Sequence, residues 1–76
     1  MTLSEVFAEV FEEPATSFTD ESDQQSVPNW TSMRHVALLV RIEKVFGTRF
    51  SNAEMATMRS MGDIRSVLSR KGVEAA

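Results

Sequence analysis

The feature that most constrains this chain is a strongly apolar run between residues 33 and 46, within only 76 residues in total. Thr31 stands just before the run, where a helix N-cap is expected, and Gly47 follows it as a helix stop. Most residues of the run are apolar and would cover a wide arc of a helix. We therefore predict a helix over residues 32–46 and expect it to lie at the centre of a helical bundle.

The first residues predict an amphipathic helix over residues 3–13. Thr2 and Glu5 have the spacing of a capping box. Apolar residues then recur at helical spacing and form one stripe, made of Leu3, Val6, Phe7, Val10 and Phe11. Because proline cannot continue a helix, Pro14 should end this one at about Glu13.

Two further helices are predicted in the second half of the chain. A Ser-x-x-Glu capping box at Ser51 starts a short helix over residues 52–58. Ser60 is the expected cap of the last helix, residues 61–70, and Gly72 should end it.

Residues 14–31, between the first two helices, show no helical period and are rich in Ser, Thr, Asp and Gln. A loop of this length is unusual in so small a domain. Phe18, Val27 and Trp30 are apolar, and we expect them to tie the loop to the core. The whole chain, 1–76, is thus predicted to be one all-α domain, a four-helix bundle with a long first loop and a short third helix.

Composition argues against several classes of protein. The chain has no cysteine and one histidine, so we expect no disulfide and no metal site. We find no transmembrane run and no signal peptide, and we expect a cytoplasmic protein. The two parts of the chain differ in charge: residues 1–30 carry seven acids and no Lys or Arg, whereas residues 31–76 carry all eight bases. We expect attraction between these halves, or a docking surface of both signs.

Ser32, where the polar loop meets the apolar helix, has three chemical interpretations. A hydrolytic pair with His35 lacks an orienting carboxylate and a nucleophile elbow, so we expect no enzyme. Nucleic-acid binding through Arg34, Arg41 and Lys44 is disfavoured by the net charge of −3. Covalent modification remains, because a helix N-terminus would favour a phosphodiester by about 0.3–1 kcal/mol.

Short motifs around Ser32 resemble those of acyl carrier proteins. Trp30-Thr31-Ser32-Met33 is similar to the family's Asp-Ser-Leu-like motif, and Ile42-Glu43 with Phe46-Gly47 to its Leu-Glu-x-x-Phe-like helix ending. The stretch Ser60-Met61-Gly62-Asp63-Ile64 resembles the Thr-Val-Gly-Asp-Leu-like start of the last helix. The resemblance covers residues 27–70, plus the layout of the first helix and loop. With Trp before the motif and His three residues after the serine, the chain resembles stand-alone carriers of specialised pathways.

The resemblance implies that Ser32 carries a 4′-phosphopantetheine arm, transferred from coenzyme A by a Mg²⁺-dependent phosphopantetheinyl transferase. The arm's thiol would hold acyl groups as thioesters. A monomeric carrier would shuttle them between acyl-loading and acyl-processing enzymes, as in fatty acid or polyketide biosynthesis. Met55, Met58 and Met61 would either let the last two helices part around an acyl chain or simply fill the core.

The chain departs from the family in two ways. Thr31 replaces the usual Asp before the serine; it still caps the helix but removes a carboxylate that bears on transferase recognition. The family's second helix is usually acidic, whereas here we predict a partner-binding face made of Thr31, Met33, Arg34, Ala37, Arg41 and Lys44. We expect partners whose docking patches are less basic, or which also engage the acidic loop around Asp20, Glu21 and Asp23.

Two alternatives to an acyl carrier stay open: a peptidyl or aminoacyl carrier, and an unmodified helical interaction domain with the carrier fold. His35 also has two interpretations. It would either hydrogen-bond a phosphodiester on Ser32, one turn back, or be a half-exposed surface residue.

Overall fold

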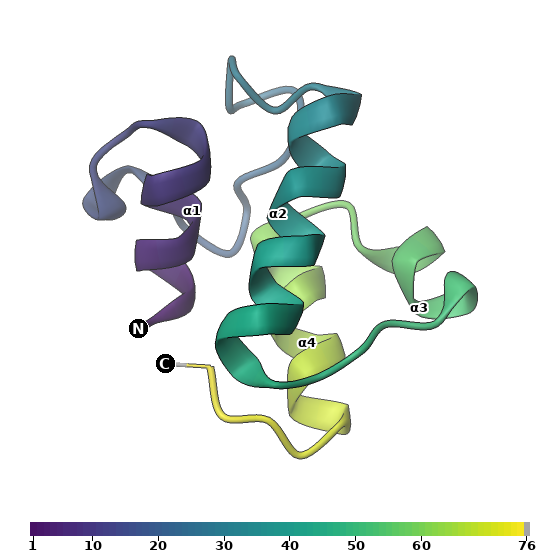
Figure 1. Cartoon of the computed structure of the whole chain (residues 1–76). Helices are drawn as coiled ribbons and strands as arrows, with labels where there is room; N and C mark the ends of the chain where they lie inside the picture. The colour runs from purple at the N-terminus through teal and green to yellow at the C-terminus, as the bar shows by residue number, and fades with distance from the viewer. Residues whose placement is uncertain (76) are drawn as a thin grey trace.

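Four α-helices and one 3-10 turn form the secondary structure of residues 1–75, which are the residues that the computed structural model describes. The elements are α1 (Leu3–Phe11), η1 (Ala15–Ser17), α2 (Ser32–Phe46), α3 (Asn52–Thr57) and α4 (Met61–Arg70). These residues contain no strand, which agrees with the predicted all-α class. In Figure 1, α2 lies between α1 and α3, with α4 partly behind it.

The helices α2 and α4 have the predicted bounds, 32–46 and 61–70. Each starts at a side-chain cap: the Thr31 hydroxyl accepts from the backbone N–H of Arg34, and the Ser60 hydroxyl accepts from Asp63. Gly47 takes the left-handed conformation, with φ of 64°, and ends α2 as a glycine C-cap does. Local cap chemistry therefore determines both helices.

The predicted end of the first helix, at residue 13, is wrong by two residues. Helix α1 ends at Phe11, and Glu12 adopts a left-handed φ of 56°. The residue before a proline avoids helical geometry, so the chain has already left the helix at Glu13. The Asn29 amide donates to the Phe11 carbonyl at 3.3 Å and thereby satisfies a helix-end acceptor.

Helix α3 is one residue shorter than predicted, ending at Thr57 rather than at residue 58. Met58 is its C-cap and is buried in the core, with 1% of its surface exposed. None of the residues of α3 is buried, so polar contacts of the helix and of the segment before it hold it in place. The backbone N–H of Phe50 donates to Glu43 at 2.8 Å, and Lys71 pairs with Glu54 at 3.0 Å.

Aromatic rings tie the long loop to α1. Trp30 packs against both Phe7 and Phe11, at ring-centroid distances of 5.5 and 5.3 Å, and Phe18 lies 5.4 Å from Phe7. Phe18, Val27 and Trp30 are all buried, which confirms that they anchor the loop. The rest of the core comes from one face each of α1, α2 and α4 and from the two residues that flank α3, namely Leu3, Val6, Leu38, Leu39, Ile42, Met61, Ile64, Val67 and Leu68 with Phe50 and Met58.

The same loop also supplies acceptors to the start of α4. The backbone N–H of Met61 donates to the Ser22 carbonyl at 3.0 Å, and that of Gly62 donates to the Asp20 carbonyl at 2.9 Å. Arg65 adds an ion pair to the Asp20 carboxylate at 3.1 Å. The first N–H groups of a helix have no intrahelical acceptor. The loop carbonyls accept from two of them and thereby cap the start of α4.

The second helix has the central place that the sequence predicts, between α1 and α3 (Figure 1), but it is not buried all round. Only Leu38, Leu39 and Ile42 of α2 are buried. Two of its apolar residues are largely exposed, Met33 at 85% and Val36 at 62%. The core covers one face of α2 and leaves the opposite face to solvent.

We predict that Gly62→Ala destabilises the protein, although alanine is ordinarily the better helix former by up to about 1 kcal/mol. A Cβ at this position would lie 2.9 Å from the Asp20 carbonyl oxygen, which is backbone and cannot move alone. The expected loss is about 1–3 kcal/mol in the free energy of unfolding, measured by urea denaturation. Ser66→Ala, on an exposed position of the same helix, is the control and should change stability by less than about 0.5 kcal/mol. A more stable Gly62→Ala protein would contradict the loop contact.

Candidate functional site

Ser32 is the first residue of α2, and its side chain is exposed. Thr31 accepts two backbone N–H groups of the first turn, that of Arg34 at its hydroxyl (3.2 Å) and that of His35 at its carbonyl (2.9 Å). The N–H groups of Ser32 and Met33 have no intrahelical acceptor at this end of the helix. A hydroxyl in this position is open to an enzyme, and a phosphate attached to it would lie beside free N–H donors.

Trp30 fixes the neighbouring histidine. The indole Nε1–H donates to His35 Nδ1 at 2.9 Å, and the two rings stack with centroids 5.9 Å apart and planes at 26°. Since Nδ1 accepts this bond, the proton of the neutral imidazole lies on Nε2. His35 then has no free lone pair to accept the Ser32 proton, so the two residues do not form a nucleophile–base pair in this arrangement.

Partial burial lowers the pKa of His35 below its usual value of 6.5. The cause is desolvation, which disfavours the charged imidazolium. Protonation of Nδ1 would also remove the acceptor that Trp30 uses. His35 is thus partly buried, close to the half-exposed residue of one sequence interpretation, but its Nδ1 is bonded to Trp30.

The six predicted partner-binding residues separate into two groups. Thr31, Met33, Ala37 and Lys44 are exposed. Arg34 and Arg41 are half-buried and turn toward α1. The structure therefore does not bring all six residues together on one free surface.

The two arginines join α2 to α1. Arg34 lies 3.4 Å from the Glu12 carboxylate and also donates to the Val10 carbonyl. Arg41 lies 2.9 Å from Glu9, as an ion pair without a well-directed hydrogen bond. Three of the four ion pairs among residues 1–75 connect the acidic first part of the chain with the basic second part. Each is partly exposed and contributes about 0.2–1 kcal/mol, so the charge division serves internal attraction.

An apolar surface runs along the exposed side of α2. We call it the α2 stripe, and it consists of Met33, Val36, Ala37 and Val40. Their spacing of three and four residues places them on one face, opposite Leu38 and Ile42. The sequence prediction included Met33 and Ala37 in the partner-binding face but missed Val36 and Val40, which are also exposed. The only sequence signal for Val36 and Val40 was their helical spacing. That spacing does not separate an exposed apolar face from the core face, because both have helical periodicity.

The methionines predicted to border an acyl chain are placed differently from one another. Met58 and Met61 are buried at 1% exposure, whereas Met55 is 37% exposed. Residues 1–75 contain no cluster of three or more His, Cys, Asp or Glu that could hold a metal ion. No helix among them is long and apolar enough to cross a membrane.

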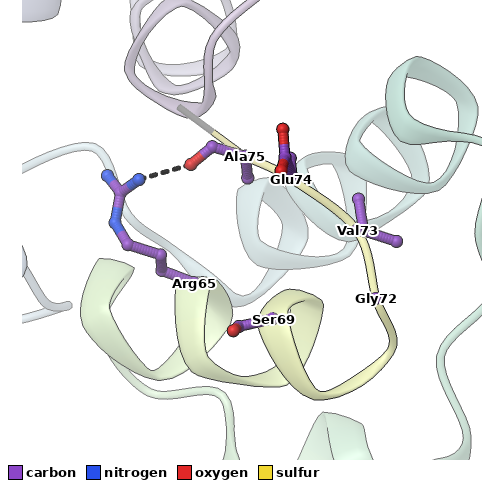
Figure 2. Close-up of a pocket in the computed structure, with 6 residues that line it drawn as sticks. All are labelled: Arg65, Ser69, Gly72, Val73, Glu74 and Ala75. Carbon is purple, nitrogen blue, oxygen red and sulfur yellow. Dashed lines mark hydrogen bonds between the residues drawn. The ribbon is translucent and has the colours of Figure 1, made fainter.

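An open pocket lies on the far part of α4, where the chain turns back at Gly72. Figure 2 shows its lining, with Arg65 donating to the Ala75 carbonyl across the mouth. Neither Ser32 nor any predicted partner-binding residue contributes to it. The site around Ser32 is therefore a surface feature at the start of α2 and not part of this pocket.

A comparison with models of known protein families finds no match for this chain, and a comparison with curated proteins finds no significant relative.

We predict that His35 makes the free energy of unfolding depend on pH as the pH falls through and below about 6.5. Because the pKa of His35 is lower in the folded state, the unfolded chain binds a proton first. Stability is then full above the unfolded value of 6.5 and declines as the pH falls through it. Three carboxylates also have a lowered pKa, namely Glu5, Asp23 and Glu54. They change the pH dependence of stability only near and below about pH 4.

The measurement is urea denaturation at several pH values, with Trp30 fluorescence as the signal. His35→Asn offers a non-titrating oxygen to the indole and should flatten the dependence in this range. If the free energy of unfolding of His35→Asn depends on pH as steeply as that of the original chain, a group other than His35 causes the dependence.

Proposed function

We propose that this protein is a discrete acyl carrier protein, with Ser32 as the attachment point of a 4′-phosphopantetheine arm and its four helices in the carrier arrangement. The observation that carries the proposal is the exposed Ser32 hydroxyl at the first turn of α2, directly after the Trp30-Thr31 motif. When bound, the arm would supply a terminal thiol that holds acyl groups as thioesters.

The residues around Ser32 fit such a group. No acidic residue lies in the first turn of α2, so nothing there repels a phosphodiester. The N–H groups of Ser32 and Met33 are available, and the helix dipole favours an anion by about 0.3–1 kcal/mol. Thr31 caps the helix without adding a negative charge beside the phosphate.

The α2 stripe supports docking of partner enzymes beside the arm. It begins at Met33, the residue next to Ser32, and continues for two turns to Val40. Lys44 follows one turn later and is exposed. A partner that binds this face would place its active site near the start of α2, where the arm is attached. The proposed partners are a phosphopantetheinyl transferase and acyl-loading and acyl-processing enzymes.

One observation favours a second candidate, an unmodified helical interaction domain. Thr31 gives the site no carboxylate, and the α2 stripe would serve as a binding surface without any arm. The two candidates differ in whether Ser32 is modified, so one experiment separates them.

We expect the chain to gain the mass of one phosphopantetheinyl group when it is incubated with coenzyme A, Mg²⁺ and a broad-specificity phosphopantetheinyl transferase. Intact-mass spectrometry gives the result. Ser32→Ala should gain nothing, because the nucleophilic hydroxyl is gone. Ser4→Ala, which alters a serine in the first turn of α1, is the matched control and should be modified normally.

A folded chain that gains no mass with several transferases would refute the carrier proposal and leave the unmodified interaction domain. A gain that survives Ser32→Ala would place the arm elsewhere. Loading of the modified chain by an amino-acid-activating enzyme, rather than an acyl-loading one, would identify an aminoacyl carrier.

We further predict that Met33→Ser slows arm transfer about tenfold in kcat/KM, because it removes apolar surface that the transferase buries. Met33 is 85% exposed, so the free energy of unfolding should change little. Arg70→Ser, on the exposed end of α4, is the control. Reversal of Arg34 or Arg41 is a poorer test, since it also breaks the pairing with α1. An unchanged rate for Met33→Ser would exclude the stripe as the transferase's docking surface.

A further inference from the structure

The His35 imidazole lies back over the start of α2. Side chains on a helix tilt toward its N-terminus, and the bond from Trp30, five residues earlier, shows that this ring does so. Ser32 is three residues before His35, at the spacing of neighbours on a helix surface, with Cβ atoms about 5–6 Å apart. The imidazole therefore lies at the same end of the helix as the proposed attachment point.

Trp30 restricts the ring in both position and protonation. Trp30 is 3% exposed and packs against both Phe7 and Phe11, so it gives a rigid anchor. An indole N–H is only a donor, and it takes up the Nδ1 lone pair of His35. The remaining polar group of the neutral imidazole is Nε2–H, which is a donor and has no acceptor among residues 1–75.

The charged side chains nearest in sequence and on the packed helix are already engaged. Arg34 pairs with Glu12, and Arg41 pairs with Glu9. Burial is the cause of the lowered pKa of His35, with no contribution from a neighbouring charge. An anion placed at Ser32 would thus be the first charge that the imidazole senses directly.

We propose that His35 is a positioning residue for the phosphodiester on Ser32, with its Nε2–H, oriented by the Trp30 bond, donating to a phosphate oxygen. This inference rests on the proposed function, because it requires the arm. The hydrogen bond would fix the first atoms of the arm against the start of α2, while the thiol end stays free to reach partners. Trp30, His35 and the phosphate then form one chain of hydrogen bonds that begins in the aromatic core.

The test compares the unmodified and arm-bearing forms of the chain by NMR. His35 is the single histidine, so its imidazole signals need no assignment by mutation. In the arm-bearing form we expect a higher His35 pKa, because a phosphate anion stabilises the imidazolium. We also expect an Nε2–H proton that exchanges more slowly with water, and a ³¹P signal that shifts as His35 titrates.

His35→Asn is the matched variant. Its amide oxygen can accept from Trp30, but it has no group at the Nε2 position and does not titrate. The arm-bearing variant should keep the Trp30 fluorescence of the original chain and lose the pH-dependent ³¹P shift. A fluorescence change would show that Trp30 is displaced in this variant. His35→Gln then serves as the second variant, because its longer amide reaches toward the Nε2 position. We expect its amide protons to exchange slowly with water near the phosphate.

The outcomes separate the two proposals. Arm attachment with an unchanged His35 pKa and a ³¹P signal insensitive to pH would overturn the positioning role and leave the carrier function intact. Failure of arm attachment in the mass experiment would overturn both, because no phosphodiester would exist for His35 to bind.

Discussion

The packing of Trp30 against Phe7 and Phe11 is the contact on which most of this structure depends. It closes the long loop onto α1 and so fixes where α2 begins, because Thr31 follows directly as the N-cap. The buried indole still has a polar N–H, which must find an acceptor. His35 provides it, and the core thereby determines the geometry of a surface site.

The interface between α1 and α2 combines this apolar contact with two arginines. Arg34 and Arg41, seven residues apart, lie on the same side of α2 and meet acids on α1. They lie on the flank between the core face of α2 and its exposed face, and the exposed face is the apolar stripe that begins at Met33. A helix with basic residues on its flank and apolar residues on its exposed face differs from the acidic recognition helix expected of the family that the sequence resembles.

Local chemistry made much of the fold predictable from the sequence. The caps at Thr31, Gly47 and Ser60 gave the correct bounds of α2 and α4, because a cap depends on a few adjacent residues. The end of α1 was predicted two residues too late, because the helix ends with a left-handed residue at Glu12 before the pre-proline residue Glu13, and the Asn29 amide that satisfies the Phe11 carbonyl is distant in sequence. The partners of Arg34 and Arg41, and the exposure of Val36 and Val40, also required tertiary packing. Periodicity shows that a helix has apolar faces, but it does not show which face another element covers.

The contact between the loop and α4 has a consequence for local motion. Asp20 and Ser22 supply the acceptors for the first two N–H groups of α4, so these amides are protected only while the loop is docked. The loop and the first turn of α4 must then open together, as one cooperative unit with its own free energy below that of global unfolding. Helix α3 connects directly to this turn and buries none of its own residues. The loop segment at Asp20 and Ser22, the first turn of α4 and α3 are thus distinct from the Trp30 end of the loop, which packs on α1 beside Ser32.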